Sequence, residues 1–192
     1  MRISLLATAL VAATAALPAV AADVYTLDPN HTQIRFGWSH FGFSNMTAGF
    51  DSFKGELKLD PADWTQSSVS ISIPLDSVDS GVADFDTHLK SPDFFDTGKS
   101  NEATFKSTKV EKVSDTKLNV TGDLSLHGIT KEVVLDVTIN KVGKHPMSGA
   151  EQAGFDATAT VKRSDFKVDK YAPNVSDEVW IKISTETKKA GS

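Results

Sequence analysis

The chain has 192 residues, a formal net charge of −5 and no cysteine. This length supports one domain with a sizeable core, and the lack of cysteine excludes disulfides, thiolate metal sites and thiol catalysis. The basic residues are scattered and form no stripe with interleaved aromatic residues, which argues against nucleic-acid binding.

The first 22 residues have the pattern of a secretory signal peptide. Arg2 precedes an apolar, alanine-rich run that ends in Ala19-Val20-Ala21-Ala22. Such a run is too short for a convincing membrane span and ends in the small residues of a cleavage site. We expect cleavage after Ala21 or Ala22, a mature domain over residues 23–192 and a periplasmic location. A retained N-terminal anchor is the alternative.

From residue 23 onward the dominant pattern is alternation of apolar and polar residues, which is typical of antiparallel strands with one buried face. The apolar sets are Ile34, Phe36 and Trp38; Ala48 and Phe50; Leu57 and Leu59; Val69, Ile71 and Ile73; Leu118, Val120, Leu124 and Leu126; Val133, Leu135, Val137 and Ile139; Phe155, Ala157, Ala159 and Val161; and Val179, Ile181 and Ile183. The change of parity between Phe50 and Leu57 predicts a bulge near residues 53–55. Trp180 has the opposite parity to its neighbours and is expected on the outer face or under a helix.

One segment departs from this alternation. Val82, Phe85 and Leu89 recur at helical spacing, and Ser91-Pro92 should end a helix. We predict a short helix over about residues 82–90. An apolar turn at Phe94 and Phe95 follows it, and it should plug or gate one end of the fold.

About eight strands with one buried face must close into a barrel or stack as two sheets. Alternation alone does not separate these two architectures. A sandwich has a solid core, whereas a barrel of this strand number is either filled by side chains or holds one elongated ligand. The choice decides what the aromatic run from Phe36 to Phe50 faces.

Four longer stretches carry a more specific pattern: YTLDPNHTQIRFGWSHFGFSNMTAGFDSFKGELKLD, DTHLKSPDFFDTGKSNEATFKST, LNVTGDLSLHGITKEVVLDV and VKRSDFKVD. The second stretch, with Asp93-Phe94-Phe95-Asp96, is the most specific, and GDLSLHGITKEV is nearly as specific. In this order they span nearly the whole expected mature chain. Together they resemble the YceI-like family of exported, lipocalin-like proteins.

The resemblance implies an all-β fold, an extended antiparallel eight-stranded lipocalin-like barrel with the short helix near one end and an elongated apolar cavity. It implies a periplasmic binding or carrier protein for a long-chain polyisoprenoid, either an isoprenoid quinone or a polyprenyl phosphate. No other cofactor is required. Transient membrane contact is compatible with this role, as is a monomer or a homodimer. The chain departs from the family pattern at Lys167, which stands where the family has a small residue.

The expected ligand-binding residues combine large apolar side chains with one polar corner. They are Ile34, Phe36, Trp38, Phe50, Phe85, Leu89, Phe94, Phe95, Phe105, Leu124, Leu126, Phe155, Arg163, Asp165 and Phe166. For the aromatic residues the alternative is plain core packing. For Arg163 and Asp165 it is a surface turn with a local salt bridge.

The sequence shows no motif for catalysis or metal binding. It lacks a Gly-x-Ser-x-Gly elbow, a His-Glu-x-x-His pair and a phosphate-binding glycine loop, and its five histidines show no ligand spacing. We therefore expect neither an enzyme nor a metal site. Two alternatives stay open. An enzyme acting on a prenyl or quinone substrate would place titratable groups inside the barrel. A filled barrel serving as an envelope stress or interaction protein would expose an apolar patch.

Overall fold

The structure is a computed structural model that describes residues 22–192, so the expected leader lies outside it except for Ala22. The described chain forms strands β1 (Asp23–His40), β2 (Ser44–Phe50), β3 (Lys54–Leu59), β4 (Ser68–Pro74), β5 (Val78–Asp79), β6 (Glu102–Lys112), β7 (Lys117–Leu126), β8 (Ile129–Lys144), β9 (Glu151–Lys162) and β10 (Glu178–Lys189). Its helices are α1 (Ala83–Lys90) and the short 3₁₀ helices η1 (Trp64–Gln66), η2 (Leu75–Ser77) and η3 (Arg163–Phe166).

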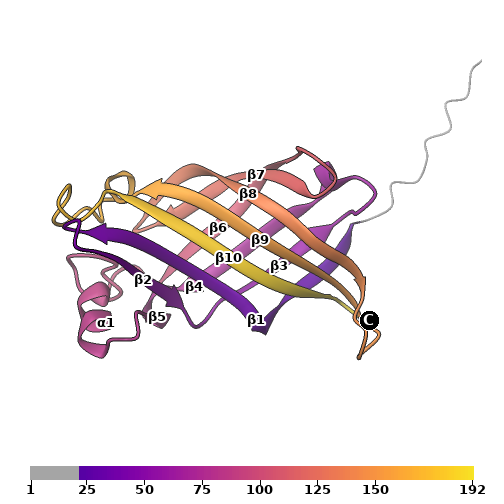
Figure 1. Cartoon of the computed structure of the whole chain (residues 1–192), viewed down its shortest axis with the longest axis horizontal. Coiled ribbons are helices and arrows are strands. Elements are labelled where there is room, and N and C mark those ends of the chain that lie inside the picture. The colour runs from indigo at the N-terminus through magenta and orange to yellow at the C-terminus, as the bar shows by residue number, and fades with distance from the viewer. Residues whose placement is uncertain (1–21) are drawn as a thin grey trace, which may run out of the picture.

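Eight of these strands close into an antiparallel barrel (Figure 1). The order is β10-β9-β8-β7-β6-β4-β3-β1, and β1 pairs back with β10. The long strand β1 has two neighbours on its other edge, because residues 23–26 pair with β3 and residues 34–40 pair with β2. Strands β2 and β5 therefore form a flap at one end, beside α1. The eight-stranded barrel expected from the sequence is confirmed.

The parity change between Phe50 and Leu57 has a different cause from the predicted bulge. Strand β2 ends at Phe50 and β3 begins at Lys54, and the two strands pair with different parts of β1. Separate strands have independent parities, so no bulge is needed. A true irregularity lies in β6 between Ser107 and Lys109. Before this irregularity the odd-numbered residues of β6, such as Phe105, face inward, and after it the even-numbered residues, such as Val110, do so.

The helix lies where the sequence predicts it. Val82 is the N-cap residue of α1, and Ser91 is the C-cap residue before Pro92. Leu89 is buried and Phe85 is partly buried, whereas Val82 is 55% exposed. The buried face of α1 is therefore built from Phe85 and Leu89, and Val82 does not belong to it.

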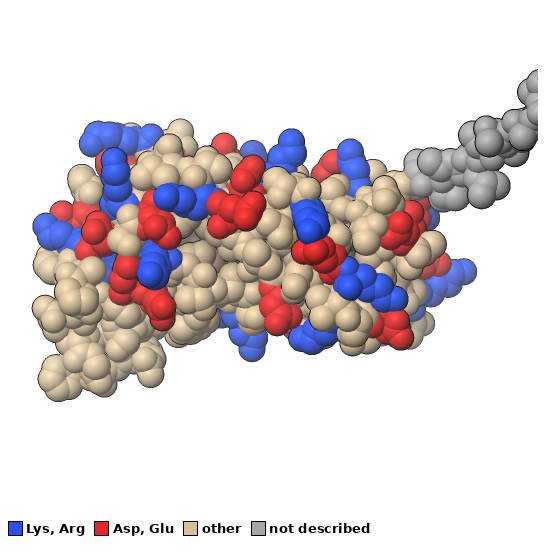
Figure 2. Space-filling model, turned by 90° about the horizontal axis from the view of Figure 1, so that it is seen from above, with Lys and Arg blue, Asp and Glu red and all other residues tan. Residues whose placement is uncertain are grey.

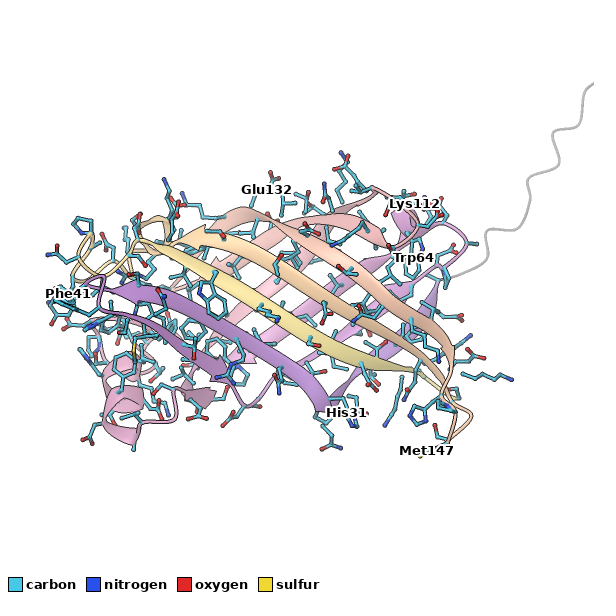
Figure 3. The ribbon with its side chains drawn as sticks, viewed as in Figure 1. His31, Phe41, Trp64, Lys112, Glu132 and Met147 are labelled. Carbon is cyan, nitrogen blue, oxygen red and sulfur yellow. The ribbon has the colours of Figure 1, made fainter. Side chains whose placement is uncertain are left out.

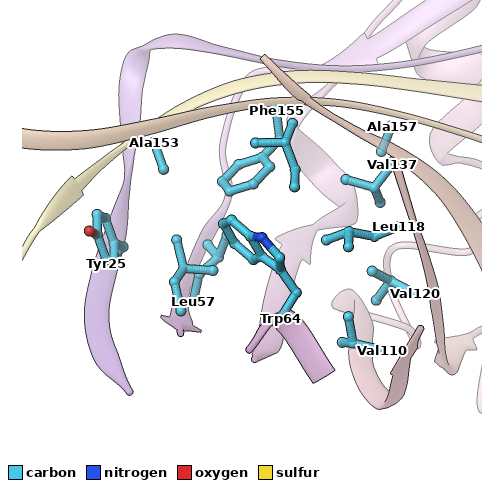
Figure 4. Packing of buried hydrophobic residues seen from close by; sticks show 12 residues of the cluster. Tyr25, Leu57, Trp64, Val110, Leu118, Val120, Val137, Ala153, Phe155 and Ala157 are labelled. Atoms are coloured by element: carbon cyan, nitrogen blue, oxygen red, sulfur yellow. The ribbon is translucent and has the colours of Figure 1, made fainter. Parts of the chain in front are cut away.

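The interior contains two apolar clusters, one toward each end of the barrel. The first gathers around Trp64 of η1, whose ring meets Phe155 edge-on at 6.2 Å between centroids (Figure 4). The second lies beneath α1 and includes Trp38, Leu89 and Phe95. One barrel end is thus closed by η1, and α1 with its following turn covers the other.

Trp180 lies on the outer face of the barrel, which is one of its two expected positions. It is 39% exposed and stands opposite Gly37 in the pairing of β10 with β1. A Cβ atom on Gly37 would lie 2.2 Å from Cζ2 of the indole. Glycine is required here because the indole covers the backbone of β1 directly.

Candidate functional site

A cavity of about 590 Å³ runs inside the barrel, and all eight barrel strands contribute to its wall. Along β7 the lining extends from Leu118 to Leu126, which corresponds to about 26 Å of extended chain. The wall is almost entirely hydrocarbon, and no described lining residue is Asp or Glu. This volume lies in the range of small-molecule sites, and the shape fits a long apolar ligand.

An aromatic wall lies at the α1 end of the cavity. The ring centroid of Phe36 lies 5.7 Å from that of Trp38, 5.3 Å from that of Phe50 and 5.9 Å from that of Phe95. The ring centroid of Trp38 lies 5.8 Å from that of Phe85 in α1. Strands β1 and β2, α1 and the turn after it thus bring together rings that are far apart in the sequence.

Fourteen of the fifteen residues expected at the ligand site line the cavity. They are Ile34, Phe36, Trp38, Phe50, Phe85, Leu89, Phe94, Phe95, Phe105, Leu124, Leu126, Phe155, Arg163 and Phe166. Asp165 does not line it, and that expectation needs correction. In η3, with three residues per turn, Arg163 and Phe166 share the inward side while Asp165 is exposed to solvent.

The cavity lining reaches the protein surface at the α1 end. Four residues there, which we call the rim, line the cavity and are also exposed: His40, Phe41, His88 and Tyr171. The ring of Phe94 connects two of them, with its centroid 4.9 Å from His88 and 6.5 Å from Tyr171. The rim combines aromatic surface with a few hydrogen-bonding groups, an arrangement that suits the polar end of an amphiphile.

Arg163 holds the irregular segment that borders the rim. Its Nε donates to the carbonyl oxygen of Ser176 at 2.9 Å, and Nη2 donates to that of Val175 at 2.9 Å. Its Nη1 donates to the carbonyl oxygens of Val168 at 2.8 Å and Lys170 at 3.3 Å. Burial lowers the pKa of the guanidinium from its usual value. These four hydrogen bonds use most of the N–H donors of Arg163 within the protein. The guanidinium group still lines the cavity.

A buried carboxylate lies away from the cavity, where β1 has its irregularity between Leu27 and Thr32. Asp28 is 4% exposed, and its Oδ2 lies 3.0 Å from Lys188 Nζ of β10 and 3.2 Å from His31 Nδ1. The backbone N–H of Asn30 donates to its Oδ1 at 3.0 Å. These contacts, the hydrogen bond from Lys188 first, lower the pKa of Asp28 to about 2. Asp28 fastens β1 to β10 and does not line the cavity.

Several lining residues were missed by the sequence reasoning. Leu57, Val69 and Val120 follow the alternating pattern, so parity could have identified them. Trp64 and Tyr171 lie in η1 and in the irregular segment after η3, where no periodic signal exists.

Within residues 22–192, no group of three or more His, Asp and Glu side chains is arranged to hold a metal ion. In the same part of the chain, no helix has the length and apolar character needed to cross a membrane.

Comparisons with known proteins agree along nearly the whole described chain. A family model described as YceI-like domain matches residues 25–187. A UPF0312 protein of Vibrio parahaemolyticus is 42% identical over 171 residues, covering 88% of this chain and 89% of that protein. A UPF0312 protein of Ectopseudomonas mendocina is 37% identical over 170 residues, covering 88% of each.

Solved structures share the fold. BcnA of Burkholderia cenocepacia has a TM-score of 0.76 at 27% identity, covering 83% of this chain and 98% of its own. A Campylobacter jejuni YceI protein has a TM-score of 0.72 at 31% identity, covering 79% and 89%. A polyisoprenoid binding domain from Saccharophagus degradans has a TM-score of 0.64 at 17% identity, covering 86% and 98%, which shows a shared fold. With its barrel, its cavity and a family match over residues 25–187, this chain belongs to the YceI-like family.

Proposed function

We propose that this protein binds one long-chain polyisoprenoid, an isoprenoid quinone or a polyprenyl phosphate, inside its barrel and carries it in the periplasm. The observation that carries the proposal is the elongated cavity of about 590 Å³ with an almost purely hydrocarbon wall. A solved relative in fold is described as a polyisoprenoid binding domain, which supports the choice of ligand class. One chain contains the whole cavity, so the proposal applies to a monomer and to a homodimer.

The energetics of transfer favour a carrier over a permanent store. Burying a methylene group is worth about 0.8 kcal/mol against water, which over a polyprenyl tail would exceed any known non-covalent affinity. The tail, however, comes from a bilayer in which it is already in an apolar environment. Exchange between bilayer and cavity is therefore nearly balanced. Chain length, shape and contacts at the polar end then set the preference, and the ligand can be both loaded and released.

The two ends of the cavity suggest an orientation for the ligand. Trp64 and Phe155 close one end with apolar rings. The rim at the other end offers the imidazoles of His40 and His88 and the hydroxyl of Tyr171, with the charge of Arg163 nearby. We place the tail toward Trp64 and the polar end of the ligand at the rim.

Along the ligand tail, the same wall favours binding over catalysis. Acid–base chemistry on a prenyl chain needs titratable groups within reach of the reacting atoms. The titratable lining residues are Arg35, His40, His88, Arg163 and Tyr171, and the middle of the cavity is lined by aliphatic and phenyl groups. The volume also exceeds the small voids of a filled barrel, which supports a binding role over a purely structural one.

Intrinsic tryptophan fluorescence tests the proposal, because Trp38 and Trp64 line the cavity whereas Trp180 lies on the outer face. Delipidated protein is titrated with a long-tailed isoprenoid quinone, which quenches nearby indoles. We expect saturable quenching at one quinone per chain. A Trp38→Phe, Trp64→Phe double variant should lose most of the quenching, and Trp180→Phe should keep it. Quenching that depends on Trp180 contradicts the proposal. Absence of saturable quenching also contradicts it if the same protein fails to bind polyprenyl phosphate.

The periplasmic location has its own test. Full-length protein expressed in a Gram-negative host should appear in the periplasmic fraction. Its intact mass should lack the first 21 or 22 residues. Recovery of the full-length chain from the membrane fraction would instead support a retained anchor.

A further inference from the structure

The tip of the hairpin between β1 and β2 exposes two phenyl rings. Phe43 is 93% exposed and Phe41 is 48% exposed, and only Gly42 separates them. Exposed apolar residues are common on protein surfaces, but packing does not explain the almost complete exposure of Phe43. Phe41 is half exposed, and its ring lies edge-on to that of His40 at 4.8 Å between centroids.

The backbone of this turn is unfavourable for the residues that it contains. Phe41 has φ of 52° and Gly42 has φ of 73°, and the N–H of Phe43 donates to the carbonyl oxygen of His40 at 3.0 Å. A tight turn with two positive φ angles favours Asn-Gly or Gly-Gly. A bulky residue in the left-handed region is an outlier, and such outliers cluster at binding sites. The exposed rings and the strained backbone thus occur at the same turn.

The hairpin is also free of formal charge. No Lys, Arg, Asp or Glu occurs between Arg35 and Asp51, although 23% of the chain is charged. The space-filling view shows a broad uncharged region at the α1 end, at the lower left, while charged residues are scattered over the barrel sides (Figure 2). Near the rim, Lys170 Nζ lies 3.3 Å from Asp93 Oδ1, so its charge is paired.

The tip is continuous with the mouth of the cavity. Phe41 belongs to the rim, and its backbone N–H donates to the carbonyl oxygen of Asn174 at 2.9 Å. That bond joins the hairpin to the segment that carries Tyr171, which is itself 48% exposed. Any surface that takes up the two phenyl rings therefore meets the rim at the same time. Figure 3 labels Phe41 at this end of the barrel.

We propose that the β1–β2 tip docks on a lipid bilayer by inserting Phe41 and Phe43 into its interface, so that the rim opens onto the membrane from which ligand is loaded. This inference rests on the proposed carrier function. Apolar burial drives the contact, with aromatic Tyr171 at headgroup level. Electrostatic attraction does not contribute, because the tip is uncharged and the chain has a net charge of −5.

A tryptophan at the tip reports insertion directly. Phe43→Trp is compared with Met147→Trp, whose parent residue is 89% exposed at the opposite end of the barrel (Figure 3). Both variants retain the three native tryptophans as the same background. With phosphatidylcholine vesicles that carry brominated acyl chains, emission of Phe43→Trp should shift to shorter wavelength and be quenched, and that of Met147→Trp should not change. Equal responses of the two variants, or none, overturn the proposal.

A loss-of-contact variant gives a second measurement. Phe43→Ser should weaken vesicle binding at least about tenfold, because full burial of a phenyl side chain exceeds a factor of ten in partitioning. Met147→Ser should leave binding unchanged. Binding should be the same between about 0.05 M and 0.5 M salt, since no ion pairs form. A steep loss with salt would assign the contact to charge and contradict the proposal.

Two further readouts separate the possible failures. Quinone quenching in vesicle-free solution should be equal in wild type and Phe43→Ser. If both bind quinone but Phe43→Trp does not respond to vesicles, docking fails and the carrier function stands. If neither binds quinone or polyprenyl phosphate but Phe43→Trp is quenched by brominated lipid, the carrier function fails and docking stands. A dimer that Phe43→Ser converts to a monomer, with vesicle binding unchanged, would assign the tip to a second copy of the chain.

Discussion

Filling the cavity from one wall should stabilise the empty protein while it weakens ligand binding. Ala157 is the site of choice, because its side chain lines the cavity at the middle of β9 and is only 7% exposed. Ala157→Phe adds a phenyl ring that must enter the space of about 590 Å³. Burying such a ring is worth about 2 kcal/mol. For a domain of this size, that corresponds to an increase in Tm of about 4 to 8 °C.

The same substitution removes space from the ligand. Displacing even two methylene groups of the tail, at about 0.8 kcal/mol each, weakens binding more than tenfold. Differential scanning calorimetry of delipidated protein and quinone titration of the same samples measure the two effects. Thr158→Phe on the same strand is the matched control, since Thr158 is exposed on the outer face and should leave quinone binding unchanged.

The prediction is easy to refute, because Ala157→Phe should raise the Tm of the protein and at the same time weaken quinone binding. A tightly filled interior would respond to the added ring by losing about 1–3 kcal/mol of stability. If Ala157→Phe lowers Tm and binds quinone as the wild type does, the cavity is not the ligand site and the account of the barrel interior is wrong.

Three further substitutions test structural elements around the site. Asp28→Asn should lower the free energy of unfolding by about 2 kcal/mol at pH 7, because the folded-state pKa of about 2 lies below the unfolded value of 3.8. This contribution is present above pH 3.8 and is lost as pH falls through about 2, so urea unfolding should show a smaller difference at pH 3 than at pH 7. Arg163→Lys keeps the charge but loses the guanidinium group that donates to four carbonyl oxygens. It should lower the free energy of unfolding by about 2–3 kcal/mol. Amide hydrogen exchange over residues 167–176 should become faster. Unchanged exchange there would show that other contacts hold the segment. Gly37→Ala should lower the free energy of unfolding by about 1–3 kcal/mol, because the added Cβ atom clashes with Trp180. In the Trp180→Ala background the same substitution should cost less, and urea unfolding of the four proteins in a double-mutant cycle measures that difference. Fully additive effects would contradict that contact.

The sequence predicted the barrel interior well because one physical rule governs it. In a barrel strand, alternate residues face inward, so parity places Phe36, Leu124 and Phe155 on the buried face without any knowledge of pairing. The family resemblance supplied the barrel and its cavity. The helix was equally predictable from the spacing of Phe85 and Leu89 and from the proline that follows.

The rest depends on contacts that are distant in sequence. Strand β1 pairs with β2 along residues 34–40 and with β3 along residues 23–26. The sequence alone does not reveal this division, and the predicted bulge at residues 53–55 was wrong for that reason. Trp64 lies in the three-residue helix η1 and Tyr171 in an irregular segment, and both are too short to show a period in the sequence. Asp165 was assigned to the site with its neighbour Arg163, but the 3₁₀ geometry of η3 separates their directions.

Identification of any lipid that copurifies with the protein tests the central claim most directly. The full-length chain is expressed in a Gram-negative host, and the protein is purified from the periplasmic fraction without detergent. It is examined by native mass spectrometry, and an organic extract of it is then identified. We predict one bound molecule per chain, released as a polyprenyl compound or an isoprenoid quinone. A different long-chain amphiphile would keep the cavity as a lipid site and overturn the isoprenoid assignment. An unliganded mass, from protein that also fails to bind added quinone and polyprenyl phosphate, would contradict the carrier function itself.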